Sequence, residues 1–514
     1  MNNNSRLGKS LLNLFSGFAY RLFIMFTAFA VRSVFIRCLS EDYLGINGLY
    51  SNILSMLSLA ELGFGTAMVY SMYLPLANRD YKKLAQLMQL YKRAYQIIGS
   101  VVLVLGLCVV PFLNAIIRNK PNVDGLTFYY LLFLGDTVLS YWFFAYRNSI
   151  LQADQKAYVI TVYQSIFNLI KSAIQIILLL CFRSYTVYLL TQIACTVIQN
   201  IALAIKVKQE YPELSGQSTE TLPADEKRRI FQDVKALMLS RISHVVLNSS
   251  DTIIISAFVG IRWVGLLSNF NMVVEAITGI LCQITSAISA SLGNYFAQED
   301  SESGYQLFKH VDFLNFWLYG FSTIALIVLL NPFVTLWIGS DFTIPFAVVV
   351  ALVLRFLVNG QMNTLSTFRS SLGLFTQGKY RPLIAAGLNI ILSIGLSYVC
   401  GVTGVLIATA ITRCCVNLWY TPWILHRDGF RKSVKPYFVS WLQRLLVLAV
   451  LTGLMIIISW LVFRDGVTFG NFAIMVLLVA IIPNAVLVLI YHRCTDFIYV
   501  FDLVRKLTCS IIKR

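Results

Sequence analysis

The sequence predicts an all-α polytopic membrane protein with about 14 transmembrane helices, and three observations support this prediction. Hydrophobic residues make up 58% of the 514 residues and charged residues only 13%, against about 45–50% and 25% in soluble proteins. The apolar residues form continuous runs, which favour helices over the alternating pattern of a β-barrel. The polar stretches between the runs are too short for a separate globular domain. A soluble enzyme, a secreted disulfide scaffold and a disordered chain are therefore excluded.

Each apolar run is long enough to cross the hydrocarbon core, which takes about 20 helical residues. Six runs precede the polar stretch from Lys206 to Arg229, six follow it, and two more end the chain after a short basic link. Several contain Pro, Gly or Asn, where we expect kinks or local unwinding. The predicted spans are 11–35, 43–74, 94–117, 126–146, 157–182, 185–205, 235–259, 263–294, 311–338, 343–372, 382–400, 402–425, 438–463 and 469–492.

The lysines and arginines of the connections predict the orientation in the membrane. Even-numbered connections are rich in these residues, as at Lys82-Lys83 and Arg228-Arg229, whereas odd-numbered connections are short and nearly uncharged. Because Lys and Arg accumulate in cytoplasmic loops, we predict that both termini are cytoplasmic. The net charge of +17 is then a consequence of topology, and nucleic acid is not an expected partner.

An internal repeat predicts the domain organisation. A block around Arg147 recurs around Arg369 at an offset of 222, and Tyr43-Leu44-Gly45 resembles Trp263-Val264-Gly265 at an offset of 220. Six helices per repeat is an even number, so we expect two six-helix lobes of one orientation, related by an axis along the membrane normal. The predicted domains are an N-terminal lobe with its cytoplasmic linker (1–230), a C-terminal lobe (231–430), and two extra helices with a basic cytoplasmic tail (431–514).

Charged side chains inside the predicted spans are candidate functional residues, because a charge at the bilayer centre costs about 2.5–3.5 kcal/mol and usually faces a cavity. Arg21 and Arg32 lie on one face of span 1, within about 20° of each other. Arg241 begins a polar stripe on span 7, and Arg355 and Arg369 are the ends of another on span 10. The other members of the two stripes are His244, Asn248, Asp251, Asn359, Asn363 and Ser366.

The excess of basic over acidic residues in the spans predicts an anionic solute, and the planar fork of arginine suits phosphate oxygens. The alternative interpretation is that Arg21, Arg241 and Arg369 extend from the cytoplasmic ends of their spans to the membrane interface.

Three acidic residues are candidates, from their depth alone, to bind a coupling proton or sodium ion: Asp136, Asp251 and Glu275. No metal or other cofactor is predicted, because the ten cysteines include no CxxC and do not pair with the four scattered histidines.

Two motifs near the N-terminus resemble those of a known family. They are Glu41-Asp42-Tyr43-Leu44-Gly45-Ile46-Asn47-Gly48-Leu49-Tyr50 and Ala60-Glu61-Leu62-Gly63-Phe64-Gly65. Together with the basic first helix, they resemble the Wzx-type polysaccharide and O-antigen flippases of the multidrug/oligosaccharidyl-lipid/polysaccharide exporter superfamily. The general architecture extends the resemblance over about residues 10–425.

The resemblance implies two six-helix lobes around a cavity that opens alternately to each face. It implies a bacterial cytoplasmic (inner) membrane protein that moves an undecaprenyl-pyrophosphate-linked oligosaccharide from the inner to the outer leaflet, with a polysaccharide polymerase and glycosyltransferases as expected partners. It also implies that cationic cavity residues engage the pyrophosphate. That role is transferred only to the arginines that lie on predicted stripes: Arg21, Arg32, Arg241, Arg355 and Arg369.

Three other functions fit a polytopic membrane protein, and the sequence favours each of them less. Lipid II flippases have 14 spans, and the extra pair at 438–492 keeps that function open. A cation-coupled multidrug exporter should favour acidic residues for cationic drugs, whereas the spans here favour basic ones. A membrane enzyme such as a polymerase or ligase needs a reactive outer loop, and the odd-numbered connections are only a few residues long.

Overall fold

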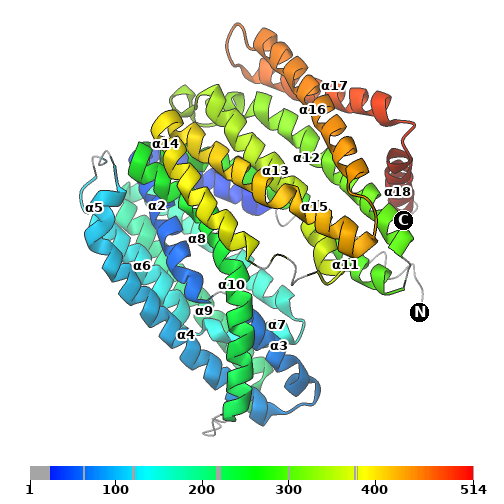
Figure 1. The fold of residues 1–514 in the computed structure, drawn as a ribbon. Helices are drawn as coiled ribbons and strands as arrows, with labels where there is room; N and C mark the ends of the chain where they lie inside the picture. Colours follow the sequence, from blue (N-terminus) through cyan, green and yellow to red (C-terminus); the bar gives the residue numbers. More distant parts are fainter. Residues whose placement is uncertain are drawn as a thin grey trace. The chain divides into compact units, whose positions relative to one another are not determined.

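The computed structural model describes residues 23–61, 64–118, 121, 123–215, 222–298, 301–374, 378 and 380–512. Every regular element in these residues is a helix and none is a strand, which confirms the predicted all-α class (Figure 1). Nine helices in the described part are long and apolar enough to cross a membrane. The chain is a multi-pass membrane protein.

The helices form two compact units. One comprises Phe23–Gly265 and the other, in its described part, begins at Leu266 and continues to the C-terminal helix. The division falls inside one long helix, α11 (Ile261–Gln298). Helix α10 (Ala224–Ile254), which the repeat assigns to the second lobe, packs on α2 and α3 in the first unit. The division into six-helix lobes and a C-terminal pair stays a prediction.

The first unit begins with a helix over residues 23–38. The predicted second span is interrupted, since its first helix ends in a 3-10 turn at Glu61 and the next starts at Phe64. The elements are α2 (Glu41–Leu57), η1 (Ser58–Glu61), α3 (Phe64–Ala77), α4 (Tyr81–Val109), η2 (Val110–Phe112), α5 (Leu113–Ile116), α6 (Leu126–Trp142), η3 (Ala145–Arg147), α7 (Asn148–Ala153), α8 (Ala157–Phe182), α9 (Tyr185–Glu210), η4 (Pro212–Ser215), α10 and η5 (Ile255–Val259).

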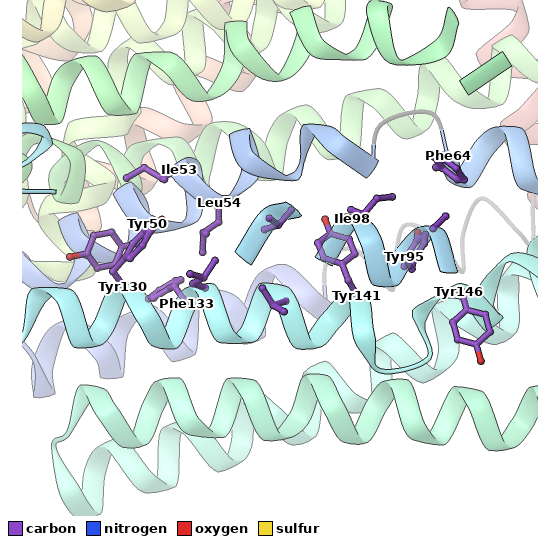
Figure 2. Packing of buried hydrophobic residues seen from close by; sticks show 14 of the residues in the cluster. Tyr50, Ile53, Leu54, Phe64, Tyr95, Ile98, Tyr130, Phe133, Tyr141 and Tyr146 are labelled. Carbon is purple, nitrogen blue, oxygen red and sulfur yellow. The ribbon is translucent and has the colours of Figure 1, made fainter. Parts of the chain in front are cut away.

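Aromatic and aliphatic residues pack together in the core of this unit, as Figure 2 shows. Tyr50 and Tyr130 are fully buried, with ring centroids 5.3 Å apart in an edge-to-face arrangement. Their hydroxyls donate to the backbone oxygens of Leu126 and Gly106, at 3.0 Å each. Each tyrosine thus buries a large apolar surface while its polar end keeps a hydrogen bond.

The structure explains the glycines of the repeated Tyr-Leu-Gly and Trp-Val-Gly motifs. A Cβ atom at Gly45 would lie 2.5 Å from the carbonyl oxygen of Ile261, and one at Gly265 would lie 2.9 Å from that of Glu41. Glu41 also pairs with Arg262 at 2.8 Å. The two motifs therefore pack on each other, and only glycine permits this approach of α2 to the start of α11.

The second unit is built around α12 (Ser301–Ile338), which contacts α13 and all three C-terminal helices. The predicted spans 11 and 12 form a continuous run that is broken at Gly401, where φ is +57°. The remaining elements are η6 (Ser340–Phe342), α13 (Phe346–Ser371), α14 (Arg381–Arg413), η7 (Cys414–Leu418), α15 (Tyr420–Ile424), η8 (Leu425–Phe430), α16 (Lys435–Val462), α17 (Phe469–Tyr491) and α18 (Thr495–Ile512).

The predicted cytoplasmic tail forms a helix, α18, which packs on α12. The Nδ1 atom of His310 lies 2.7 Å from Oδ1 of Asp496, and the imidazole stacks on Tyr499 at 4.1 Å. Helix α16 is joined to α12 by a buried ion pair between Arg444 and Asp312, at 2.7 Å.

Candidate functional site

Arg32 lies on the first described helix, with its side chain partly buried. It interacts electrostatically with Tyr188 and Tyr185 of α9. These two rings stack 6.1 Å apart, and the edge of Phe35 packs against both. The electrostatic surroundings of Arg32 therefore include two tyrosines of α9.

Two of the predicted arginines cannot be assigned contacts. Arg21 lies outside the described residues, as does the side chain of Arg241 on α10. Farther along the same helix, Asp251 is buried with 2% of its side chain exposed.

Arg355 lies beside two polar residues of α11. Its Nη2 atom donates a hydrogen bond of 2.8 Å to Oδ1 of Asn271. Glu275, one turn farther along α11, interacts electrostatically with Arg355. The structure thus brings together a predicted substrate residue and a predicted coupling-ion residue.

Arg369 lies in the last turn of α13, and its Nε atom donates to the backbone oxygen of Leu374 at 2.9 Å. Arg381, at the start of α14, is close enough for the two positive charges to repel. The guanidinium carbon of Arg381 lies 3.5 Å from the ring centroid of Tyr420. We call Arg369, Arg381 and Tyr420 the arginine corner.

The stripe on α13 does not form one compact site. Arg355 and Arg369 are fourteen residues apart, which is about 21 Å along a helix axis. This is longer than a pyrophosphate group, so the two arginines serve different positions along α13.

Asp136 of α6 is the acidic candidate with the clearest environment. Its Oδ2 atom accepts a hydrogen bond of 2.7 Å from Gln192 of α9. Its Oδ1 atom is buried and has no hydrogen-bond partner among the described residues. A buried carboxylate oxygen without a donor is a site where a proton or a cation is stabilising.

The first unit has a corner with a basic residue beside its own repeated block, which precedes the block of the arginine corner by 222 residues. There Lys156 pairs with Asp154 at 2.8 Å and with Glu210 at 3.2 Å. The Tyr211 hydroxyl donates to Asp154 and accepts from Lys156. Arg147, the counterpart of Arg369, donates to the backbone oxygen of Ala204. We call Asp154, Lys156, Glu210 and Tyr211 the lysine corner.

Ion pairs and hydrogen bonds set the protonation states of the lysine corner. Its residues lie outside the predicted spans 157–182 and 185–205. The hydrogen bond to Asp154 raises the pKa of Lys156 above its usual 10.5, and burial opposes this only in part. Burial raises the pKa of Asp154, but the hydrogen bonds from Lys156 and Tyr211 outweigh it and hold this pKa below 3.8. Burial raises the pKa of Tyr211 to about 12. At neutral pH the corner contains a lysinium and an aspartate.

Sequence reasoning missed Arg381 and Lys156, which lie beside the repeated blocks. Each is adjacent in sequence to a repeated residue, since Tyr380 precedes Arg381 and Gln155 precedes Lys156. The repeat could have directed attention to them, but their different partners depend on residues far along the chain. Within the described residues, no group of three or more His, Cys, Asp and Glu is placed to hold a metal ion.

Comparison with solved structures shows the fold. The match to a structure titled "Lipid II flippase MurJ, inward closed conformation" has a TM-score of 0.65 at 15% identity and covers 94% of this chain and 99% of that chain. An inward-facing multidrug resistance MATE family transporter of the MOP superfamily matches with a TM-score of 0.56 at 14% identity, over 80% of this chain and 98% of that chain. The Vibrio cholerae MATE transporter VcmN matches at 0.55 and 14%, over 83% and 98%.

Comparison of sequences identifies the family. No curated protein matches the chain. Residues 10–289, more than half of the sequence, match the family described as "Polysaccharide biosynthesis protein". This region includes both motifs on which the resemblance rested, and the chain belongs to this polysaccharide biosynthesis protein family.

Proposed function

We propose that this protein is a flippase that moves an undecaprenyl-pyrophosphate-linked oligosaccharide from the inner to the outer leaflet of the bacterial cytoplasmic membrane. The observation that carries the proposal is the family match over residues 10–289 of a chain with a lipid-flippase-like fold. A pyrophosphate and several sugars cannot cross hydrocarbon unaided, because each unsatisfied polar group there costs several kcal/mol.

The arginines inside the spans supply the chemistry that this substrate needs. Arg355 donates a hydrogen bond to Asn271, which orients its guanidinium before a ligand arrives, and Arg32 interacts electrostatically with Tyr185 and Tyr188. A guanidinium fork donates paired hydrogen bonds to phosphate oxygens. We propose that Arg32 and Arg355 engage the head group as the two lobes rock, with Arg21, Arg241 and Arg369 as further contacts.

Proton or sodium coupling is the second part of the proposal. In the first unit, Asp251 is buried and Asp136 has one buried carboxylate oxygen, and in the second unit Glu275 interacts electrostatically with Arg355. An ion that neutralises one of these carboxylates changes the balance of charge around the arginines. Both termini are proposed to be cytoplasmic, with a polymerase and glycosyltransferases as partners in the same pathway.

The test is translocation of a fluorescent undecaprenyl-pyrophosphate oligosaccharide in proteoliposomes. We expect Arg32→Ala and Arg355→Ala to reduce the rate by about 10- to 100-fold, the value of a buried charge-assisted hydrogen bond. Arg464→Ala, in an exposed loop, is the matched control and should leave the rate unchanged. If Arg32→Ala and Arg355→Ala both transport at the wild-type rate, these arginines do not take part in translocation.

Lipid II is the second candidate substrate, because the match to MurJ covers 94% of this chain and the MATE matches cover 80–83%. The same assay with fluorescent lipid II separates the two candidates. Transport of lipid II but of no other lipid-linked glycan would favour this second function. Efflux of a cationic dye without either lipid activity would indicate a multidrug exporter.

A further inference from the structure

The guanidinium of Arg381 has a hydrogen-bond donor that is not satisfied by the residues around it. Its Nη2 atom is buried and has no hydrogen-bond partner in the described part of the chain. None of the ion pairs recorded there includes Arg381 either. A buried N–H without an acceptor costs about 1–3 kcal/mol, and more when the group is charged. An anion that accepts from Nη2 would remove this cost.

The lysine corner shows what a basic residue beside the other repeated block looks like when its charge is satisfied. Lys156 has two carboxylates within 3.2 Å and a tyrosine hydroxyl at 3.3 Å. Arg381 has instead the aromatic rings of Tyr420 and Trp419, with centroids at 3.5 and 5.7 Å. The basic residue beside the first repeated block is therefore paired with internal anions, and the one beside the second is packed on aromatic rings.

The aromatic rings set the orientation of the guanidinium. Tyr420 lies against its face, which holds the plane in place and leaves the N–H edge to donate. The backbone at the start of α14 is already occupied, since the amides of Leu383 and Ile384 donate to the oxygen of Tyr380. An anion at this corner would thus be bound by side chains, with the positive N-terminal end of α14 adding a favourable field.

The corner is predicted to lie at the membrane interface, where lipid phosphate groups occur. Helix α14 begins at the predicted cytoplasmic end of span 11, at the depth of lipid headgroups. Tyr380 and Trp419 flank it with 58% and 52% of their surfaces exposed, as aromatic residues do at a membrane interface. Arg369 adds a second positive charge beside Arg381.

We propose that the arginine corner is a phosphate-binding site in which Tyr420 orients Arg381 and the guanidinium donates to a phosphate oxygen. The ligand is the phosphate group of a membrane lipid, either the pyrophosphate of the lipid-linked substrate or the headgroup of an anionic phospholipid. Only the first source rests on the proposed function.

The test measures binding of two named lipids to the purified full chain in phosphatidylcholine nanodiscs. Undecaprenyl pyrophosphate is titrated in one arm and phosphatidylglycerol in the other, and the shift in Tm gives the apparent affinity. We expect at least one lipid to bind the wild type, and Arg381→Gln to weaken that binding about tenfold or more. Lys156→Gln, which removes the basic side chain of the lysine corner, is the control and should bind as the wild type does.

The binding experiment tests the phosphate site independently of the proposed transport function. Binding of phosphatidylglycerol alone identifies a headgroup site, and binding of undecaprenyl pyrophosphate alone identifies a substrate subsite. Wild-type affinity in Arg381→Gln, or no binding of either lipid by the wild type, overturns the proposal, even where glycolipid transport is normal. If Arg381→Gln fails to fold, Arg381→Lys takes its place and is expected to bind less tightly, because it keeps the charge but loses the stacked fork.

Discussion

Each of the two compact units has an ion pair that joins two of its long helices, and these two pairs lie at different depths. In the first unit, the side chains of Lys83 and Glu226 pair at 2.9 Å while 39% and 38% exposed. In the second, Arg444 and Asp312 pair at 2.7 Å while only 11% and 5% exposed. The exposed pair joins the water-facing ends of helices, whereas the buried one fastens a C-terminal helix to α12. Depth therefore predicts which pairs matter for stability.

Burying the ion pair of Arg444 and Asp312 has a large desolvation penalty, and removing only one partner destabilises the fold strongly. Removing two ions from water costs several kcal/mol each, which the pair recovers only with good geometry and other favourable contacts. Arg444 has such contacts, since its guanidinium carbon lies 5.4 and 5.6 Å from the rings of Phe313 and Phe316. Asp312 keeps one buried oxygen without a hydrogen bond in the described residues.

The largest effect is expected for Asp312→Asn. It leaves the Arg444 guanidinium buried without its counterion, which should lower the free energy of unfolding by about 3–5 kcal/mol. Thermal unfolding in detergent measures the loss as a fall in Tm. The double variant Asp312→Leu with Arg444→Met is the control, since replacing both ions by apolar groups should restore most of the stability. A single variant as stable as the wild type would contradict the importance of depth.

A smaller effect is expected at the α12–α18 contact. Asp496→Ala removes the acceptor of the His310 hydrogen bond, at a cost of about 1–3 kcal/mol. Because Asp496 lies in the first turn of α18, the change should loosen this helix more than the rest of the unit. Hydrogen exchange of residues 495–502 should quicken, while exchange in α13 should not change. Equal acceleration in both would show that α18 does not open on its own.

Lys83→Gln should have an effect of about 0–1 kcal/mol, because both partners of its ion pair are well exposed. The wild-type Tm should approach that of the variant in 1 M salt, since salt screens exposed charges. A loss as large as that of Asp312→Asn would break the comparison between the two units.

The smallest effect is a pH dependence at the lysine corner. The raised pKa of Lys156 stabilises the fold below pH 10.5, and this contribution is lost as pH rises through the folded-state pKa. The lowered pKa of Asp154 stabilises it above pH 3.8, and that contribution is lost as pH falls through its folded-state pKa. The difference in Tm between wild type and Lys156→Gln should therefore be constant from about pH 5 to 9 and shrink outside that range. A change within the range would assign the titration to another group.

Several features of the fold could be predicted from local sequence. Apolar runs predicted the membrane helices, because helix formation in lipid depends on a continuous stretch of apolar residues. The break between spans 11 and 12 also followed from the sequence, and the structure puts it at Gly401. The glycines of the two repeated motifs were recognised, but their mutual packing needed the structure, since Gly45 and Gly265 are 220 residues apart.

The candidate site was only partly predictable. The sequence indicated Arg355 and Glu275 as separate functional residues, and the structure shows them interacting. It indicated Arg369 but not Arg381, because a single basic residue at the end of a span has the same pattern whether it reaches the interface or binds an anion. The orphaned Nη2 atom and the ring of Tyr420 distinguish these cases only in three dimensions.

The sequence by itself determined that this protein is a helical, multi-pass membrane protein of the polysaccharide biosynthesis protein family. Hydropathy and motifs are properties of short segments, so they can be read without knowing any long-range contact. Only the tertiary structure decided which charges are neutralised, since Arg444 finds Asp312 across 132 residues and Lys156 finds Glu210 across 54. Ion pairing depends on distances between side chains, and those distances are set by how the helices pack.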